Sequence, residues 1–269
     1  MSKNPYLSII VPTFNSENTI KATLESITSQ SFSDIEVIVM DGESTDRTCE
    51  IVKSFTEEYD EIKLISQKDS GGYDAMNKGI RESKGDYLYF MGSDDVFYQD
   101  STLDSLVNSI DAKSDFIDGN VLFKHSNQVY SGESSLQRLV YDQISICHQA
   151  IVYSRRAFEE LGDYDLNFFV HADYDFNIRC FKSEKIVTQY VDQIIAVFNE
   201  KGISGNYSNK DGFHTQLTHE NIREKEDVIA LYYENKELKD RISKIKQSRN
   251  YKFGSLLLKP FRYIKKLFT

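Results

Sequence analysis

Four polar segments in the first hundred residues carry side chains that could do chemistry. They are Pro12-Thr13-Phe14-Asn15, Asp41 to Asp46, Asp69 to Gly79, and Gly92-Ser93-Asp94-Asp95. A single aspartate in such a position is most often a helix cap. Each segment, however, follows an apolar run typical of a strand, and the carboxyl ends of parallel strands share one edge of a sheet, where ligands bind. Four such segments on one edge favour a ligand site.

The residue types suit a nucleotide carrying a diphosphate. Asp41 and Asp69 could accept hydrogen bonds from a nucleobase or from ribose hydroxyls, and Thr13 and Asn15 could line the base. The sequence has neither a G-x-G-x-x-G motif nor a Walker A motif, so no glycine-rich cradle holds the phosphates. The Asp94-Asp95 pair offers carboxylate oxygens, which Mg²⁺ or Mn²⁺ prefers. A divalent cation there would bridge the diphosphate.

Alternating apolar patterns predict the elements that position these segments. Short strands are expected at 7–11 (ended by Pro12), 35–40, 62–65 and 87–91, and helices at 16–29, 45–55 and 73–82. Ser44 or Thr45 is available to cap the second helix. Strands and helices alternating at this spacing predict an α/β fold with right-handed crossovers and a parallel sheet.

The pattern from residue 116 onward is less regular. It predicts a hairpin of strands 116–123 and 128–130, a strand at 151–153, a helix at 173–181, two closing strands at 186–191 and 194–198, and a long charged helix at about 219–246. Gly, Ser and Asn between 206 and 214 indicate a boundary before that helix.

Composition excludes several classes of protein. The chain has 269 residues, of which 40% are hydrophobic, so it can bury a core and is not disordered. No apolar run approaches the ~18–20 residues of a membrane-spanning helix, and the first residues do not resemble a secretory signal. Cys49, Cys147 and Cys180 are sparse and unclustered, which predicts reduced thiols in a cytoplasmic protein without disulfides or a zinc site.

The formal charge of −10 is unevenly distributed. Residues 236–269 contain eleven Lys and Arg but only two acids, a net charge of +9, so the rest of the chain carries −19. An acidic body argues against binding to nucleic acid. The basic tail, in contrast, suits an anionic membrane surface.

The motifs VPTFN, DGESTDRT, DSGGYDAMNKGI and SDD, in this order and spacing, resemble those of glycosyltransferase family 2 over roughly residues 7–205. The resemblance implies the GT-A fold, a Rossmann-like and mostly parallel central sheet flanked by helices, here with a C-terminal helical extension. It also implies inverting transfer from a nucleotide-diphospho-sugar with a divalent metal, Mn²⁺ or Mg²⁺. The residues it implies for donor binding are Pro12, Thr13, Asn15, Asp41, Ser44, Asp69, Asp74, Met76, Asn77, Asp94, His148 and Gln149. The usual Asp-x-Asp signature is replaced by Ser93-Asp94-Asp95, and we favour Asp95 for the metal and Asp94 for the ribose.

The resemblance also implies a catalytic base. Family members carry an acidic pair at the start of a helix, and the matching segment here is Ala172-Asp173-Tyr174-Asp175. Asp173 would take the proton of the acceptor hydroxyl; the alternative is a helix cap. His148 could bind a diphosphate or acceptor oxygen, or be a buried structural histidine. His171 could orient Asp173 or lie on the surface, and His214 could close over the donor.

The expected organisation is a catalytic domain at 1–205, a helical extension at 206–247 and a basic amphipathic tail at 248–269. The tail interleaves Leu, Ile and Phe with Lys and Arg, as interfacial helices do; the alternative is a helix docked on the body or on a partner subunit, so a homo-oligomer is possible. We expect a glycosyltransferase peripheral to the cytoplasmic face of the membrane, acting on a glycan or lipid-linked acceptor in cell-surface polysaccharide synthesis. The alternatives are a non-catalytic scaffold of the same fold and, more weakly, a nucleotidyltransferase.

Overall fold

The computed structural model describes residues 4–201 and 212–218, together with Lys236, Leu238 and Arg241. The chain divides into two compact units, Met1–His214 and Thr215–Thr269, and every element below belongs to the first. The tail at 248–269 and nearly all of the helix expected at 219–246 lie outside the described residues. The domain division expected at 205/206 also falls among undescribed residues and stays a prediction.

The first half of the chain alternates strands and helices, as predicted. Its elements are β1 (Leu7–Thr13), α1 (Ile20–Thr28), β2 (Ile35–Asp41), α2 (Thr48–Thr56), β3 (Ile62–Ser66), α3 (Gly72–Glu82) and β4 (Tyr87–Phe90). The helical spacing of α1 puts Ile20, Leu24 and Ile27 on one buried face. Strands β1, β2 and β4 form because their apolar runs are buried on both faces of the sheet, whereas the edge strand β3 buries only Ile62.

Helix α2 begins three residues later than predicted, and neither Ser44 nor Thr45 caps it. Asp46 performs that role, because its Oδ1 accepts hydrogen bonds from Thr48 N (2.9 Å) and Thr48 Oγ1 (2.5 Å). Ser44 and Thr45 are bound instead to Asn15, in the loop after β1.

Strand β1 occupies the centre of the parallel half of the sheet. It pairs in parallel with β2 on one side and β4 on the other, and β2 pairs in parallel with β3. The sheet order is β3-β2-β1-β4-β8-β6-β9-β5, with β7 attached to β6. The chain therefore changes direction across the sheet at β1, which creates the crevice where α/β folds bind ligands.

Pro12 does not end β1 as predicted; the strand continues to Thr13, with Pro12 opposite Met40. The carbonyl of Ile10 accepts from Met91 N on the β4 side, and the carbonyl of Thr13 accepts from Gly42 N on the β2 side. Because successive residues face alternate neighbours, Pro12 faces the β4 side, beyond the end of β4 at Phe90. Its missing N–H leaves no sheet hydrogen bond unmade.

The second half of the chain completes a mixed sheet. Its elements are β5 (Val96–Phe97), α4 (Thr102–Ser109), β6 (Phe116–Phe123), β7 (Val129–Ser131), β8 (Ile151–Ser154), α5 (Arg155–Leu161), α6 (Ala172–Lys182) and β9 (Thr188–Phe198). The hairpin of β6 and β7 is confirmed. The two closing strands are in fact one, because β9 follows β6 throughout and absorbs the break near Asp192 as a register shift.

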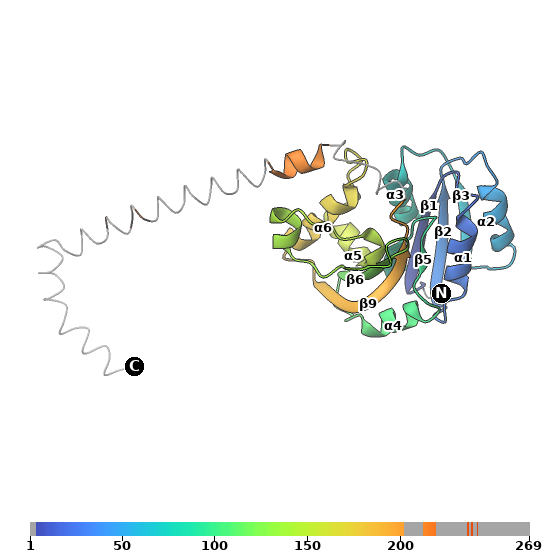
Figure 1. Ribbon diagram of the computed structural model, residues 1–269, viewed down its shortest axis with the longest axis horizontal. Helices are drawn as coiled ribbons and strands as arrows, with labels where there is room; N and C mark the ends of the chain where they lie inside the picture. Colours follow the sequence, from blue (N-terminus) through green and yellow to red (C-terminus); the bar gives the residue numbers. More distant parts are fainter. Residues whose placement is uncertain (1–3, 202–211, 219–235, 237, 239–240, 242–269) are drawn as a thin grey trace, which may run out of the picture. The chain divides into compact units, whose positions relative to one another are not determined.

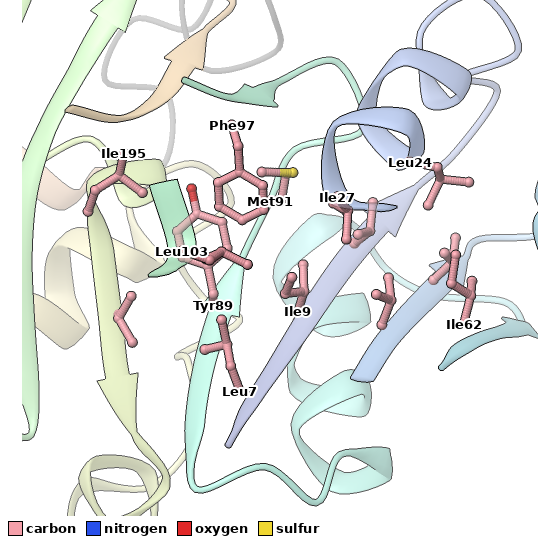
Figure 2. Close-up of a cluster of buried hydrophobic side chains, with 14 of the residues drawn as sticks. Leu7, Ile9, Leu24, Ile27, Ile62, Tyr89, Met91, Phe97, Leu103 and Ile195 are labelled. Carbon is pink, nitrogen blue, oxygen red and sulfur yellow. The ribbon is translucent and has the colours of Figure 1, made fainter. Parts of the chain in front are cut away.

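Helices cover both faces of the sheet (Figure 1). On one face, α1, α2 and α4 pack on a core that includes Leu7, Ile9, Tyr89, Leu103 and Ile195 (Figure 2). On the other face, α5 and α6 pack through aromatic rings, such as Phe158 stacked on Phe176 at 4.2 Å. Both layers are needed because a parallel sheet is apolar on both sides.

Candidate active site

The loops after β1 and β2 are joined at the carboxyl edge of the sheet. Asn15 N donates to Ser44 Oγ (2.8 Å), and Asn15 Oδ1 accepts from Thr45 N (2.9 Å). Asn15 reaches this position with a positive φ of 48°, which asparagine tolerates better than most residues. Ser16 Oγ lies 2.8 Å from Ser93 Oγ in the loop after β4. Three of the four predicted polar segments are therefore in direct contact.

Asp41 is only 1% exposed, and its carboxylate holds the loop that follows β2. Its Oδ2 accepts from Ser66 Oγ (2.6 Å) and Cys49 Sγ (3.1 Å), and Ser44 N is within 3.3 Å of both oxygens. Burial acts to raise the pKa of Asp41, but these hydrogen bonds outweigh it and lower the pKa. Asp41 is therefore ionised and shapes the loop; its contact with a nucleotide stays a prediction.

Asp69 brings the fourth polar segment to the same edge. A Cβ built on Gly42 would lie 2.6 Å from Asp69 Oδ2, so the Asp69 side chain packs directly against the loop after β2. Asp69 Oδ1 accepts from Gly71 N (2.9 Å), and burial raises the pKa of Asp69. Within the described residues, Asp69 Oδ2 accepts no hydrogen bond. It is the free acceptor of this loop.

Of the other residues predicted from the third segment, Asp74 and Met76 serve α3 itself, whereas Asn77 holds the loop after α5. Asp74 accepts from Ser70 N and pairs with Lys78 (3.1 Å), and Met76 is buried. The amide of Asn77 clamps the backbone of Tyr164, donating to its carbonyl (3.0 Å) and accepting from its N–H (3.0 Å). Their predicted contacts with the donor remain untested.

Replacing Asn77 with Ala is expected to lower the free energy of unfolding by about 2–3 kcal/mol, because the buried N–H and C=O of Tyr164 both lose their partner. Urea denaturation measures this, and Asn108→Ala on α4 is the control, because its amide bonds only Asp104 at the surface. Weaker nucleotide binding with unchanged stability would instead support the predicted donor contact.

The two carboxylates after β4 converge on one turn. A Cβ built on Gly92 would lie 2.4 Å from Asp95 Oδ2 and 3.2 Å from Asp94 Oδ1. Asp95 is 1% exposed, whereas Asp94 is partly exposed. Burial, with the charge of Asp94, raises the pKa of Asp95 to about 7. A cation between the two groups would relieve this repulsion.

Neutral donors hold the pair in place. Asp95 Oδ2 accepts from Gln149 Nε2 (2.5 Å) and Oδ1 from Asn199 N (2.7 Å). Asp94 Oδ2 accepts from Asn199 Nδ2 (2.8 Å), while Asp94 Oδ1 accepts nothing from the described part of the chain. Gln149 was predicted to contact the donor directly; in this structure its amide supports Asp95. Asn199 was not predicted.

The acidic pair fits a hard divalent cation. No group of three His, Cys, Asp or Glu among the described residues could enclose an ion. A cation at Asp94 and Asp95 would therefore take its other ligands from the diphosphate and from water, as Mg²⁺ commonly does. The free Oδ1 of Asp94 is the most available ligand, so the division of roles between Asp94 and Asp95 stays a prediction.

Asp173 lies at the start of α6, 9% exposed, with its two oxygens in different settings. Oδ1 accepts from Tyr73 OH (2.7 Å) and from Tyr174 N (2.8 Å). Oδ2 lies 3.7 Å from His148 Nδ1 and accepts no hydrogen bond from the described residues. One oxygen is held and the other is left able to take a proton.

His148 connects the two acidic centres. The charges of Asp173 and Asp94 both favour its protonated form, but burial is stronger and lowers the pKa of His148. The imidazole is therefore neutral near pH 7, and its buried Nε2 has no hydrogen-bond partner among the described residues. Thr13 Oγ1, at the end of β1, is also buried and has no hydrogen-bond partner among the described residues. Unpaired buried polar atoms such as these are suited to meet a ligand.

His171 directly precedes α6, where it stacks on Phe213 with 5.2 Å between ring centroids. His214 lies edge-on to His171 at 4.9 Å. Both imidazoles thus belong to an aromatic cluster two residues from Asp173.

Sequence reasoning missed Tyr73 and Asn199. Tyr73 lies within the motif DSGGYDAMNKGI, where its own spacing gives no sign of an active-site role. Burial, with the charge of Asp173, raises the pKa of Tyr73 well above its usual value, so its hydroxyl remains a donor. Asn199, which directly follows an apolar run, shows the same signal as the four predicted segments and could have been found by it.

Comparison with known sequences decides the family. Residues 8–162 match glycosyl transferase family 2. The chain belongs to this family. The resemblance seen in its motifs is thereby confirmed, and the protein is a glycosyltransferase.

Two relatives illustrate the similarity. The chain is 40% identical over 201 residues to the PGL/p-HBAD biosynthesis glycosyltransferase of Mycobacterium bovis, and this alignment covers 74% of this chain and 78% of that relative. It is 36% identical over 127 residues to glycosyltransferase AglE of Haloferax volcanii, covering 46% of this chain and 41% of AglE.

Solved structures confirm the GT-A fold of this family 2 glycosyltransferase. Residues 1–349 of S. aureus TarS, in complex with UDP, match with a TM-score of 0.64 at 22% identity, covering 77% of this chain and 62% of that one. The mannosyltransferase PcManGT from Pyrobaculum calidifontis, in complex with GDP-Man and Mn²⁺, gives 0.58 at 19% identity, covering 73% and 57%. The chain spans 38% of a longer TarS structure.

Proposed function

We propose that this glycosyltransferase inverts the anomeric carbon as it moves a sugar from a nucleotide-diphospho-sugar to an acceptor hydroxyl. The observation that carries the proposal is the position of His148, close enough to Asp173 and Asp94 for both charges to act on it. This position supports a single site that contains both a base and a diphosphate-binding carboxylate. The complexes of TarS with UDP and of PcManGT with GDP-Man support a nucleotide-sugar donor.

The chemistry follows from the two settings of Asp173. The acceptor oxygen attacks the anomeric carbon as the bond to the diphosphate breaks, and the electron pair of that bond leaves with the diphosphate. Asp173 Oδ2 takes the acceptor proton, while Tyr73 and Tyr174 N fix Oδ1. Neutral His148 lies beside Asp173 without adding charge. A divalent cation held by Asp94 and Asp95 would stabilise the charge of the leaving diphosphate.

The test is a screen of UDP-, GDP- and dTDP-sugars with Mn²⁺, read first as stabilisation of the protein against heat. The sugar that stabilises is then offered with acceptors, and the product is analysed by NMR for its anomeric configuration. Release of nucleoside diphosphate with inversion supports the proposal. Retention would contradict it, release of pyrophosphate would indicate a nucleotidyltransferase, and binding without turnover would favour the scaffold.

We further propose that the enzyme acts at the cytoplasmic face of the membrane on a glycan or lipid-linked acceptor for a cell-surface polysaccharide. No helix in the described part of the chain is long and apolar enough to cross a bilayer. The support is the charge of residues 236–269 and the name of the mycobacterial relative, a PGL/p-HBAD biosynthesis enzyme.

Deleting residues 248–269 is expected to reduce binding to anionic vesicles and to leave the catalytic unit folded. The segment contains six Lys and Arg and, from 256 to 268, seven Leu, Ile and Phe. Each basic residue near an anionic surface contributes about 1 kcal/mol, which salt weakens, and the apolar residues add a salt-insensitive part. Co-sedimentation of the full-length and the truncated protein with vesicles, with and without anionic lipid, measures this binding. Equal pelleting of both forms would point to docking on the body or on a second copy.

A further inference from the structure

Asn199 contacts both carboxylates of the acidic pair. It directly follows β9, so its backbone N–H points at Asp95 Oδ1 (2.7 Å), while its side-chain Nδ2 donates to Asp94 Oδ2 (2.8 Å). These contacts join residues more than a hundred positions apart in the sequence. Both donors are neutral, so Asn199 holds two like charges in place without cancelling either. The contacts from Asn199 therefore leave the charge of the pair unchanged for a cation.

Two contacts fix the orientation of the Asn199 amide, and one of them comes from the hairpin between β6 and β7. Asn199 Oδ1 accepts from Lys201 N (3.3 Å) and lies 3.1 Å from Nε2 of His125, so the amide nitrogen faces Asp94. Glu200, the next residue, accepts from the backbone N–H groups of His125 (3.1 Å) and Ser126 (2.8 Å). The hairpin turn and the end of β9 are thus connected by both side chain and backbone.

We propose that Asn199 is a positioning residue for donor binding, and that His125 acts through it by fixing the direction of its amide. The inference rests on the proposed function, because it concerns the same cation and diphosphate. Without the amide, repulsion from Asp95 would turn Asp94 away, and the cation would have to restore the pair on binding. The backbone contact to Asp95 survives any side-chain change, so Asp94 alone is released.

The experiment compares Asn199→Ala, His125→Ala and the control Ser126→Ala in the full chain. Ser126 lies in the same turn and contacts Glu200 through its backbone only, so its substitution keeps that contact. Calorimetric titration with UDP and with GDP, in the presence of Mn²⁺, gives the Kd, and thermal unfolding without ligand gives the stability. We expect Asn199→Ala to raise the Kd about tenfold, as the loss of one hydrogen bond to a charged group does. His125→Ala should raise it about threefold, and Ser126→Ala should leave it unchanged.

A purely structural role would lower the unfolding temperature and leave the Kd unchanged, which would overturn the proposal. Because His125 is exposed, we expect His125→Ala to fold. Its Kd therefore tests the proposal if Asn199→Ala does not fold. An unchanged Kd in His125→Ala would remove His125 from the proposal. If Asn199→Ala also failed to fold, that result would remove Asn199 from the proposal as well. If the unmodified protein bound none of UDP, GDP and dTDP, the proposed function itself would be contradicted instead.

Discussion

Replacing Asp173 with Asn is expected to slow sugar transfer by about 10²–10⁴-fold, the usual range for loss of a general base. The amide has nearly the shape of the carboxylate but cannot take the acceptor proton. Donor binding should hardly change, because Asp173 bonds Tyr73 and Tyr174 N and makes no contact with Asp94 or Asp95 among the described residues. Steady-state kinetics with the donor identified by the screen, together with calorimetry of the nucleotide, separate the two effects.

Asp175→Asn is the matched control for this variant. Asp175 is in the same first turn of α6, but its carboxylate pairs with Arg179 at 2.8 Å. Transfer by this control should stay within about threefold of the unmodified enzyme, since a partly exposed ion pair on a helix contributes only about 0.5 kcal/mol. If Asp173→Asn transferred sugar at the original rate, the base would have to be another residue.

Removing the carboxylate of Asp95 is expected to weaken Mn²⁺-dependent nucleotide binding by about 100-fold or more. Breaking a buried charge pair costs about 3–5 kcal/mol, and Asp95 is nearly fully buried. Asp95→Ala would also leave Gln149 Nε2 and Asn199 N without their acceptor, so Asp95→Asn serves as the variant of conserved shape. Titration with Mn²⁺ and nucleotide, and with nucleotide alone, isolates the cation-dependent part.

Asp94→Ala tests the division of roles within the pair. Its Oδ1 is unoccupied in the described structure, whereas both oxygens of Asp95 are hydrogen-bonded. If Asp95 holds the cation and Asp94 the ribose, Asp94→Ala should weaken binding with and without Mn²⁺. If Asp94→Ala weakened only the Mn²⁺-dependent part of nucleotide binding, the cation would be assigned to Asp94. Asp104→Ala, on the exposed side of α4, should change neither.

The sequence predicted the elements whose signals are local. Strands β1, β2 and β4 are apolar runs that the fold buries, and β3 is a shorter run at the edge of the sheet. The loops after these strands meet because parallel strands end together. Strand β5 has two residues and exists only because β9 lies beside it. The break at Asp192 was taken as the end of a strand, but pairing with β6 carries β9 through it.

The sequence predicted the residues of the candidate site where their signal is local, as it did for the fold. Asp94 and Asp95 stand out because they directly follow a strand, whereas Asp173 is singled out by the resemblance to family 2; the roles of all three stay predictions. The roles of Tyr73 and Asn199 depend on partners about a hundred residues away, Asp173 and Asp94. No local pattern encodes such pairs; they arise when β9 and α6 pack on the sheet. The amides of Asn77 and Gln149 were expected at the donor for the same reason, and the folded chain engages them with Tyr164 and Asp95.

The contact between Gly42 and Asp69 has a consequence for how this family can vary. A methyl group at position 42 would lie 2.6 Å from Oδ2 of Asp69, so the Asp69 side chain would have to turn away. That movement would take the free acceptor Oδ2 out of its present place in the site. We expect relatives that bind the same nucleotide to keep both residues, and relatives with another residue at 42 to have exchanged Asp69 as well. A joint change at positions 42 and 69 would then indicate that a relative prefers a different donor.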